Sequence, residues 1–329
     1  MWERIWIREK VIDIIRKFFK DQGFHEMFTP ILVATPSAEP NLEVFETQLR
    51  TASGKKSRAF LILSPEYSLK KAVAAGSGSV FEITKCFRNN EEVSSLHNPE
   101  FTMLEWYRIG ADYKDIMNDF ENLFLKITGG TGYQGNRGDW GYRGEKYDVS
   151  LPWPRISVAD AFEKYTGIEI ETLLDEKKLI TIGEKKGYDV KDTNWEQMFY
   201  QIFFNEIEPA LKKSGRPAFV YDYPLSQAAL ARRKKSDPRF AERFEVYLAG
   251  LELGNCFSEL TDPVEQRSRL EADIAARREN NKTPYSIDEK FIEALEFGMP
   301  EMAGIAVGVD RLVMLASNSE SIGETLFLG

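Results

Sequence analysis

An arginine and a phenylalanine flank a polar loop that could bind a nucleotide. Arg88 follows the strand-like run 80–87, and Phe101 begins the next run, 101–106, after the polar loop. A guanidinium can hold a phosphate through two parallel hydrogen bonds, and a phenyl ring can stack on a base. An arginine at a strand end is more often part of a surface salt bridge, so this interpretation needs support from the rest of the chain.

The strand after the loop carries an acid on an otherwise apolar face. Successive side chains of a strand point to opposite faces, so Phe101, Met103, Glu105 and Tyr107 share one face. A carboxylate between apolar walls is costly unless a cation pairs with it. Glu105 therefore predicts a pocket that receives a positive charge.

Two further acids bracket a short turn at 249–250. A hairpin there would bring Glu245 and Glu252 together, as a site for Mg²⁺ bound to substrate phosphates. Taken alone, two glutamates at this spacing are more often solvated. Glu259 adds another acid in the strand-like run that follows.

Small residues alternate with β-branched residues at 304–309, which lets a backbone or a ligand pass close to one face. Arg311 lies where this strand pattern becomes a helix pattern. A glycine-rich strand alone is more often a packing device than a ligand site. The joint occurrence of these arginines, acids and small residues in one chain outweighs the ordinary explanation of each.

The elements that must position these residues are short strands and blocks of helix. The spacing predicts helices over 5–19, 64–75 (with Ser64 as N-cap), 113–128, 262–279 and 287–297, with a mostly helical segment at 157–212. It predicts strands over 24–32, 44–50, 60–63, 80–87, 101–106, 219–221, 243–248 and 257–260. This order favours an α+β fold with an antiparallel β-sheet flanked by helices, in one domain over 1–329 with 157–212 as an insertion.

Composition excludes several classes of protein. The formal net charge is −9 over 329 residues, which argues against DNA and other nucleic acids as partners, because basic patches bind phosphates. Two cysteines, Cys86 and Cys256, make neither a disulfide framework nor a zinc site and favour the reducing cytoplasm. The N-terminal segment mixes charged with apolar residues, so we expect neither a signal peptide nor a membrane span.

Three segments in order resemble the motifs of class II aminoacyl-tRNA synthetases. Their motif 1, a helix leading to a strand with an essential proline, is matched at 14–30, motif 2 at 87–107 and motif 3 at 304–315. The strings LSPEYSLKK at 63–71, HNPEFTMLEWY at 97–107 and LELGNCFSELTD at 251–262 are similar to the lysine branch of the lysine, asparagine and aspartate subgroup.

The same strings look closest to a family of lysyl-tRNA synthetase paralogues that ligate β-lysine to a lysine side chain of translation elongation factor P. Lysyl-tRNA synthetases place an anticodon-binding domain before motif 1, whereas here the motif 1 helix begins almost at Met1. We therefore expect no anticodon-binding domain, and elongation factor P rather than tRNA as the acceptor. Class II relatives use motif 1 as a two-fold interface, so the resemblance also implies a homodimer.

The resemblance implies roles in forming an adenylate from ATP with Mg²⁺. Arg88 would hold the α-phosphate and the substrate carboxylate, and Arg311 would stack on the adenine and reach the γ-phosphate. Glu245 and Glu252 would hold the metal. The other ATP-site residues that it implies are Asn89, Glu91, His97 and Phe101. The lysine or β-lysine pocket would comprise Ser64, Glu66, Glu105, Tyr107, Asn255, Glu259 and Ala306, with Glu105, Tyr107 and Glu259 around the side-chain ammonium.

Some points stay open. Either Glu91 or Glu92 takes the acidic role in the motif 2 loop, and Cys256 stands where the family usually has glycine. Ala306 stands where tRNA-charging lysine enzymes usually have glycine, which favours β-lysine over α-lysine. Two other functions are compatible with the sequence: an enzyme that charges tRNA or another small acceptor, and a catalytically inactive regulatory paralogue.

Overall fold

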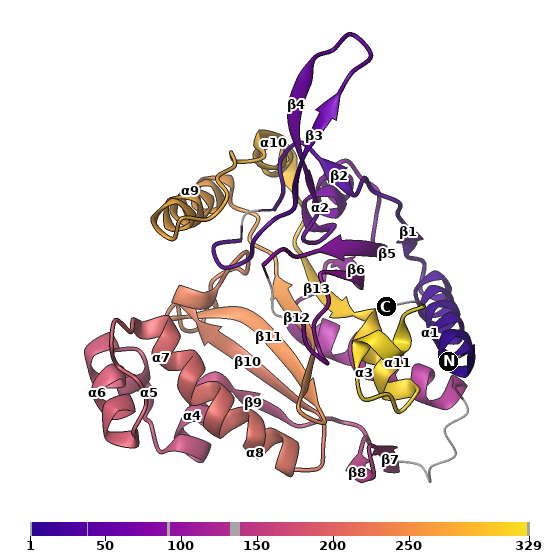
Figure 1. The fold of residues 1–329 in the computed structure, drawn as a ribbon. Helices are drawn as coiled ribbons and strands as arrows, with labels where there is room; N and C mark the ends of the chain where they lie inside the picture. Colours follow the sequence, from indigo (N-terminus) through magenta and orange to yellow (C-terminus); the bar gives the residue numbers. More distant parts are fainter. Residues whose placement is uncertain (1, 38, 91–92, 132–138, 328–329) are drawn as a thin grey trace. The chain divides into compact units, whose positions relative to one another are not determined.

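The computed structural model describes residues 2–37, 39–90, 93–131 and 139–327. By its internal contacts the chain divides into two units, the first formed by Met1–Gln134 with Cys256–Gly329 and the second by Gly135–Asn255. Figure 1 labels their elements. The helical segment expected at 157–212 lies within the second unit, and each unit is described separately below.

The first unit is built on a sheet whose strands lie in the order β1, β5, β6, β13, followed by residues 256–258 of β12. Strand β5 (Val80–Phe87) pairs antiparallel with β6 (Glu100–Ile109), and β6 pairs antiparallel with β13 (Met302–Gly308). The two-residue strand β1 (His25–Glu26) is parallel to β5. The expected strands at 80–87 and 101–106 are confirmed, the second with extensions at both ends.

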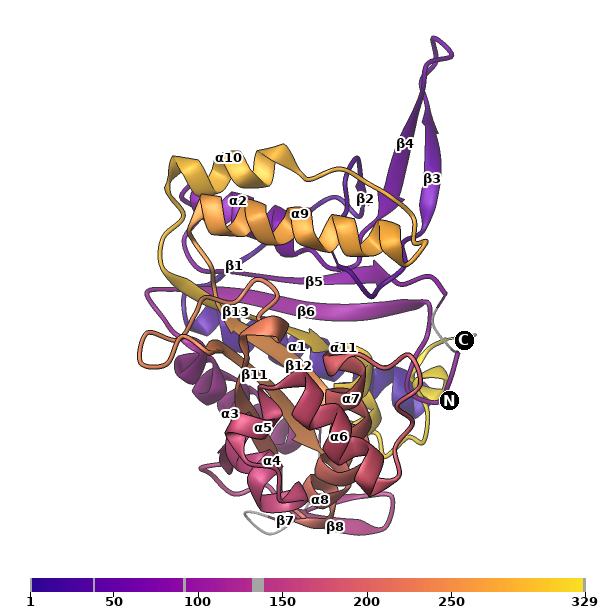
Figure 2. The same ribbon diagram turned by 90° about the vertical axis from the view of Figure 1, so that its left-hand side faces the viewer.

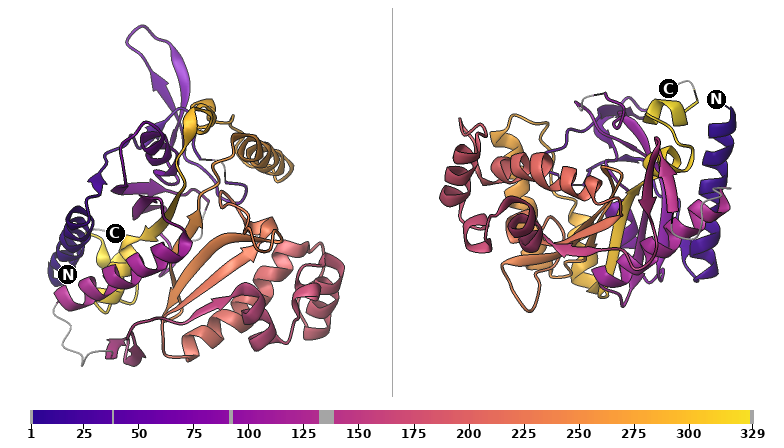
Figure 3. Two further views of the ribbon diagram at one scale, coloured as in Figure 1. Left: turned by 180° about the vertical axis from the view of Figure 1, so that it is seen from behind. Right: turned by 90° about the horizontal axis from the view of Figure 1, so that it is seen from below.

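Helices cover both faces of this sheet. Helix α1 (Trp2–Asp21) buries Val11, Ile15 and Phe19, and the Phe19 ring lies 4.9 Å from that of Trp106 on β6. Helices α3 (Tyr113–Gly130) and α11 (Val309–Ala316) pack beside α1 (Figure 3). Helices α2 (Glu66–Ala74) and α10 (Glu289–Gly298) contact each other, and α9 (Pro263–Glu279) runs beside α10 (Figure 2).

The expected strand over 24–32 is not continuous. Helix α1 ends as predicted before Gly23, whose φ of +80° suits a glycine, and β1 then covers only two residues. Pro30 lies between β1 and β2 (Leu32–Val33), outside both, because proline has no amide hydrogen to donate to a ladder. Strand β2 instead joins β4 (Lys56–Leu61) and β3 (Glu46–Arg50), whose hairpin projects from the first unit (Figure 1).

In the second unit the strand order is β12, β11, β10, β9, with a separate hairpin of β7 (Asp139–Tyr142) and β8 (Glu145–Asp148). Strand β10 (Ala218–Pro224) is antiparallel to β11 (Phe240–Leu248) and parallel to β9 (Arg155–Ser157). Strand β12 (Leu251–Ser258) begins after the predicted turn, where Ala249 and Gly250 both have positive φ, as a two-residue hairpin requires.

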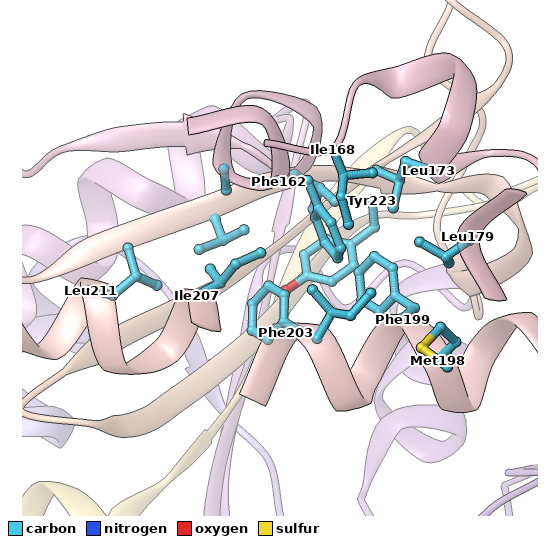
Figure 4. Packing of buried hydrophobic residues seen from close by; sticks show 14 of the residues in the cluster. Phe162, Ile168, Leu173, Leu179, Met198, Phe199, Phe203, Ile207, Leu211 and Tyr223 are labelled. Atoms are coloured by element: carbon cyan, nitrogen blue, oxygen red, sulfur yellow. The ribbon is translucent and has the colours of Figure 1, made fainter. Parts of the chain in front are cut away.

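The helical segment of the second unit packs on this sheet through one apolar cluster. Phe162, Phe199 and Phe203 interdigitate with Tyr223 of β10, and Leu179 and Leu211 close the cluster at its edges (Figure 4). The helices are α4 (Val158–Thr166), α5 (Ile170–Leu173), α6 (Glu176–Lys186), α7 (Trp195–Ile202), the π-helix η1 (Phe203–Ile207) and α8 (Glu208–Lys213). Short 3-10 helices lie at η2 (Leu225–Gln227) and, in the first unit, at η3 (Ile322–Thr325).

Candidate active site

One face of β6 and β13 forms a wall that carries a buried acid. Glu105 is 2% exposed, and Tyr107 donates a hydrogen bond of 2.5 Å to its Oε1. Ala306 lies opposite Glu105 in the register, and Gly304 lies opposite Tyr107. A Cβ on Gly304 would be 2.4 Å from the Tyr107 ring, so the small residues of motif 3 make room for this tyrosine. Glu105 Oε2 is buried without a hydrogen-bond partner among the described residues.

Two more acids and a lysine complete this acid cluster, which consists of Glu66, Lys70, Glu105 and Glu259. Lys70 and Glu66 both lie on α2, and Lys70 Nζ is 2.5 Å from Glu66 Oε1. Lys70 Nζ is also 2.5 Å from Oε2 of Glu259, the residue that follows β12. The Glu259 backbone amide donates to the Met302 carbonyl at 3.0 Å, which fixes it beside the start of β13. The structure thus brings together the predicted residues Glu66, Glu105, Tyr107 and Glu259, and it adds Lys70.

Burial raises the pKa values of two acids of the cluster, Glu105 and Glu259. Burial and the charge of Glu66 hold the pKa of Glu105 well above its ordinary value, against the opposing effects of the Tyr107 hydrogen bond and Lys70. Burial likewise raises the pKa of Glu259 to about 8, although the ammonium of Lys70 lowers it. These carboxylates are therefore poorly compensated, and a second cation would stabilise their ionised forms.

The residues expected at ATP form two pairs in the first unit. The Arg88 guanidinium lies over the Phe101 ring, 5.1 Å from its centroid. Arg311, at the start of α11, donates to His97 Nε2 at 3.2 Å, and Ser94 Oγ lies 3.1 Å from the other ring nitrogen of His97. Arg88 and Phe101 both belong to motif 2, and the second pair joins Arg311 of motif 3 to His97 of motif 2. Each pair places a guanidinium, which can bind a phosphate, beside a ring that can stack on a base.

Two other predicted residues make local structural contacts. The Asn89 backbone amide donates to the Glu43 carbonyl at 2.9 Å, and its side chain donates to the Val44 carbonyl at 3.4 Å, so it anchors the loop after β5. The prediction that Ser64 is the N-cap of α2 is wrong. Pro65 takes the N-cap position, and the helix begins at Glu66, one residue later than a Ser64 cap would require. Glu91 and Glu92 lie outside the described residues, so the acid of the motif 2 loop stays a prediction.

The remaining predicted residues belong to the second unit. Glu245 is buried and accepts hydrogen bonds from Tyr223 at 2.6 Å, Tyr247 at 2.5 Å and Arg243 at 2.6 Å. Arg243 also donates to Asn255 Oδ1 at 3.1 Å. No group of three or more candidate metal ligands occurs within the described residues.

Among the described residues this arrangement is a set of hydrogen bonds around Glu245 and not a preformed metal site. Mg²⁺ usually relies on substrate phosphates and water for most of its ligands, so a pair of carboxylates can suffice once ATP is present. The roles of Glu245 and Glu252 as metal ligands therefore stay predictions.

A buried network behind motif 3 escaped the sequence analysis. Arg8 of α1 donates at 2.5 Å to Asp310 Oδ1 and at 2.5 Å to Thr102 Oγ1, and the Thr102 amide donates to Asp310 Oδ2 at 2.6 Å. Asp310 directly precedes Arg311, so the network fixes the backbone from which this arginine extends. The one signal in the sequence was that Arg8 shares a helix face with the apolar residues Val11 and Ile15. This spacing indicates a buried arginine, but it does not specify which residues pair with it.

The comparison with known families identifies the family of the chain. The family model described as "tRNA synthetases class II (D, K and N)" matches residues 1–329. The chain belongs to the class II aminoacyl-tRNA synthetase family. Its α+β fold, with a sheet flanked by helices, agrees with this assignment, and parallel pairing occurs only where β1 meets β5 and where β9 meets β10 among the pairs described.

Relatives of this class II synthetase chain fall into two groups. A protein named elongation factor P–(R)-β-lysine ligase from Haemophilus influenzae is 37% identical over 321 residues, covering 97% of this chain and 92% of the relative. The namesake from Mannheimia succiniciproducens is 38% identical over 99% of this chain and 94% of its own length. A lysine–tRNA ligase from Shouchella clausii is 36% identical over 97% of this chain, which spans 62% of that relative.

Among its described residues, this synthetase-family chain contains no helix with the length and hydropathy that a membrane span needs.

Proposed function

We propose that the protein activates lysine or β-lysine with ATP and transfers it to a lysine side chain of translation elongation factor P. The observation that carries this proposal is the acid cluster, whose buried Glu105 Oε2 offers an acceptor to an ammonium. The relatives named elongation factor P–(R)-β-lysine ligase, which match along nearly their whole length, support the acceptor.

The first step would be an in-line attack of the substrate carboxylate on the α-phosphate. A bond forms between a carboxylate oxygen and phosphorus while the α–β phosphoanhydride breaks and pyrophosphate leaves. This reaction depends on positioning and charge neutralisation more than on a general base. Arg88 would neutralise the α-phosphate, and Phe101, His97 and Arg311 would hold the rest of ATP.

The second step would transfer the aminoacyl group to an amine. The neutral ε-amine of the acceptor lysine attacks the adenylate carbonyl, AMP leaves with the electron pair of the broken C–O bond, and the amide loses its extra proton to solvent. Such a modification of a translation factor would take place in the cytoplasm.

The test separates activation from transfer. Pyrophosphate exchange with α-lysine and (R)-β-lysine measures the first step, and transfer of labelled amino acid to purified elongation factor P or to tRNA identifies the acceptor. We expect exchange that depends on lysine or β-lysine, and labelling of elongation factor P. Labelling of tRNA alone would replace the proposed acceptor, and absence of exchange with both isomers would contradict the proposal.

A second candidate is an enzyme that charges tRNA, since the lysine–tRNA ligase of Shouchella clausii matches over an equal share of this chain. The same assay decides between the two acceptors. An inactive regulatory role fits less well, because Arg88, Arg311 and the complete acid cluster are present.

A further inference from the structure

Lys70 lies inside the pocket that the proposed function assigns to the substrate's ammonium. Its side chain is 2% exposed, and Nζ lies 2.5 Å from an oxygen of Glu66 and 2.5 Å from an oxygen of Glu259. The same ammonium lies 5.6 Å from the centroid of the Tyr107 ring and 5.9 Å from that of Phe291 on α10. A lysine of the chain itself is therefore bound as a lysine substrate would be, by carboxylates and aromatic rings.

The charges around Lys70 are unequal. Glu66 faces it from α2, Glu259 from the end of β12, and Glu105 with Tyr107 from β6, while α10 contributes the uncharged Phe291. Three buried acids thus share one resident cation. Buried carboxylates without a cation take up protons, and a protonated pair no longer attracts an ammonium.

The carboxylate oxygens of the three acids also differ in their partners. Lys70 contacts Glu66 and Glu259, whereas no lysine or arginine contact is described for Glu105, which receives only the Tyr107 hydroxyl. Glu259 Oε2 lies 2.5 Å from the Lys70 ammonium, whereas Glu105 Oε2 is buried with neither a hydrogen-bond partner nor a cation described beside it. It is the position that an additional ammonium would complete.

We propose that Lys70 is a positioning residue of the substrate pocket: its ammonium pairs with Glu66 and Glu259 and holds both carboxylates in place, which leaves Glu105 to receive the substrate's side-chain ammonium. This inference rests on the proposed lysine activation. Lys70 does not touch the reacting carboxylate or the phosphates in this scheme. It defines how much negative charge the pocket presents, and so favours a substrate with a single side-chain ammonium.

The test compares Lys70→Met and Lys70→Gln with Lys71→Met, a matched control on the same helix whose ammonium pairs with Asp288 at 2.6 Å outside the cluster. Pyrophosphate exchange is measured against lysine or β-lysine, whichever the wild type uses, and against ATP, from about pH 6 to pH 9. We expect KM for the amino acid to rise about tenfold or more at pH 7 in both Lys70 variants, with KM for ATP unchanged within about twofold.

The pH profile distinguishes this role from a merely structural one. Without Lys70, Glu259 loses the ammonium that lowers its pKa, so the rise of kcat/KM for the amino acid should move to higher pH. Lys70→Arg, which keeps the charge, should restore the wild-type profile in part. Lys71→Met should follow the wild type in both measurements. Circular dichroism identifies any variant that has not folded, and Lys70→Gln, which keeps hydrogen-bond donors, provides a second neutral variant.

Four results would overturn the inference. Equal rises in KM for ATP and amino acid, or an unmoved pH profile, would limit Lys70 to supporting the fold and leave lysine activation standing. A fall in KM for the amino acid would show that Lys70 competes with the substrate for Glu259. Absence of amino-acid-dependent exchange in the wild type would remove the proposed function itself, and this inference with it.

Discussion

Glu105 is the acid with the least compensation in the cluster, since it is buried and accepts a hydrogen bond only from the Tyr107 hydroxyl among the contacts described. Replacing it with glutamine should weaken use of the amino acid far more than use of ATP. A hydrogen bond to a charged group contributes roughly 1.5–3 kcal/mol, so KM for lysine or β-lysine should rise tenfold or more. Steady-state pyrophosphate exchange measures both constants.

Glu259→Gln should behave in the same way, because Glu259 belongs to the same cluster. Asp119→Asn is the matched control, since Asp119 is an ion-paired acid that contacts Arg108 at 2.7 Å outside the cluster. A change in amino-acid KM of less than about twofold in both cluster variants, only ~0.4 kcal/mol, would show that the ammonium pocket is assigned wrongly.

The raised pKa of Glu259 predicts how pH affects stability and binding. Burial raises this pKa from 4.5 to about 8, so the folded protein binds more protons than the unfolded chain between these values. The contribution of Glu259 to the free energy of unfolding is therefore present at low pH and is lost as pH rises toward 8. An ammonium ligand requires the ionised form, so its affinity should increase over the same range.

Thermal unfolding at several pH values, with and without lysine or β-lysine, checks this prediction. The increase in Tm caused by the ligand should be larger at pH 8 than at pH 6, and Glu259→Gln should remove most of this pH dependence. An increase that is the same at both pH values in the wild type would contradict the proposed titration.

Ala306 bears on the choice between lysine isomers, because it lies opposite Glu105 on the wall of the pocket. Ala306→Gly should shift the ratio of kcat/KM values toward α-lysine, since one methyl in a closed pocket is worth about 1–3 kcal/mol of discrimination. Ala303→Gly, on the opposite face of the same strand, controls for added strand flexibility. If the ratio moves equally in both variants, the methyl of Ala306 plays no part in selection.

At the level of elements, helix α1 is connected to motif 3 through Arg8 and Asp310. Arg8→Met would leave a buried Asp310 without its cation, and breaking such a pair costs about 3–5 kcal/mol. Because Asp310 precedes Arg311, we expect KM for ATP to rise more than KM for the amino acid. Arg4→Met is the control on the same helix, since Arg4 pairs with Glu324 at a more exposed site. Equal changes in both constants would indicate a general loss of stability.

The sequence predicted elements whose signals are local. Strand β5 matched its apolar run, the turn at 249–250 matched its residue types, and α1 ended before Gly23. The site residues on one strand face were also predictable, because alternation alone puts Glu105 and Tyr107 together.

What escaped prediction depends on contacts between distant segments. Arg8 and Asp310 are 302 positions apart, and Lys70 meets Glu259 only after α2 packs beside the end of β12. No spacing rule specifies such partners. Glu245 shows a different limit. Alternation along β11 puts Arg243 and Tyr247 on its face, but Tyr223 comes from another strand, and the sequence suggested a metal ligand where the structure shows these three donors.

For the whole molecule we expect a homodimer formed through motif 1. Trp6, on the helix that leads into this segment, and Phe28, Ile31 and Leu32, within or just after it, are exposed apolar side chains, and Phe28 is 81% exposed. Several large apolar side chains exposed in one segment are typical of an interaction surface. Sedimentation at micromolar concentration should show a dimer, and Phe28→Asp should shift it toward monomer.

Phe297→Asp is the matched control, because Phe297 on α10 is 82% exposed outside motif 1. A wild-type protein that sediments as a monomer and keeps its exchange activity would rule out the dimer as a requirement.

Both cysteines of the chain are buried, Cys86 on β5 and Cys256 on β12, and burial raises the pKa of each thiol well above its ordinary value. Because the thiolate is the nucleophile, neither should react readily with maleimides while the protein is folded. A single new cysteine at an exposed position, such as Ser53→Cys at the tip of the β3–β4 hairpin, would then be the one readily labelled thiol. The native chain is in this respect already a suitable background for a fluorescent reporter, with no need to remove its own cysteines.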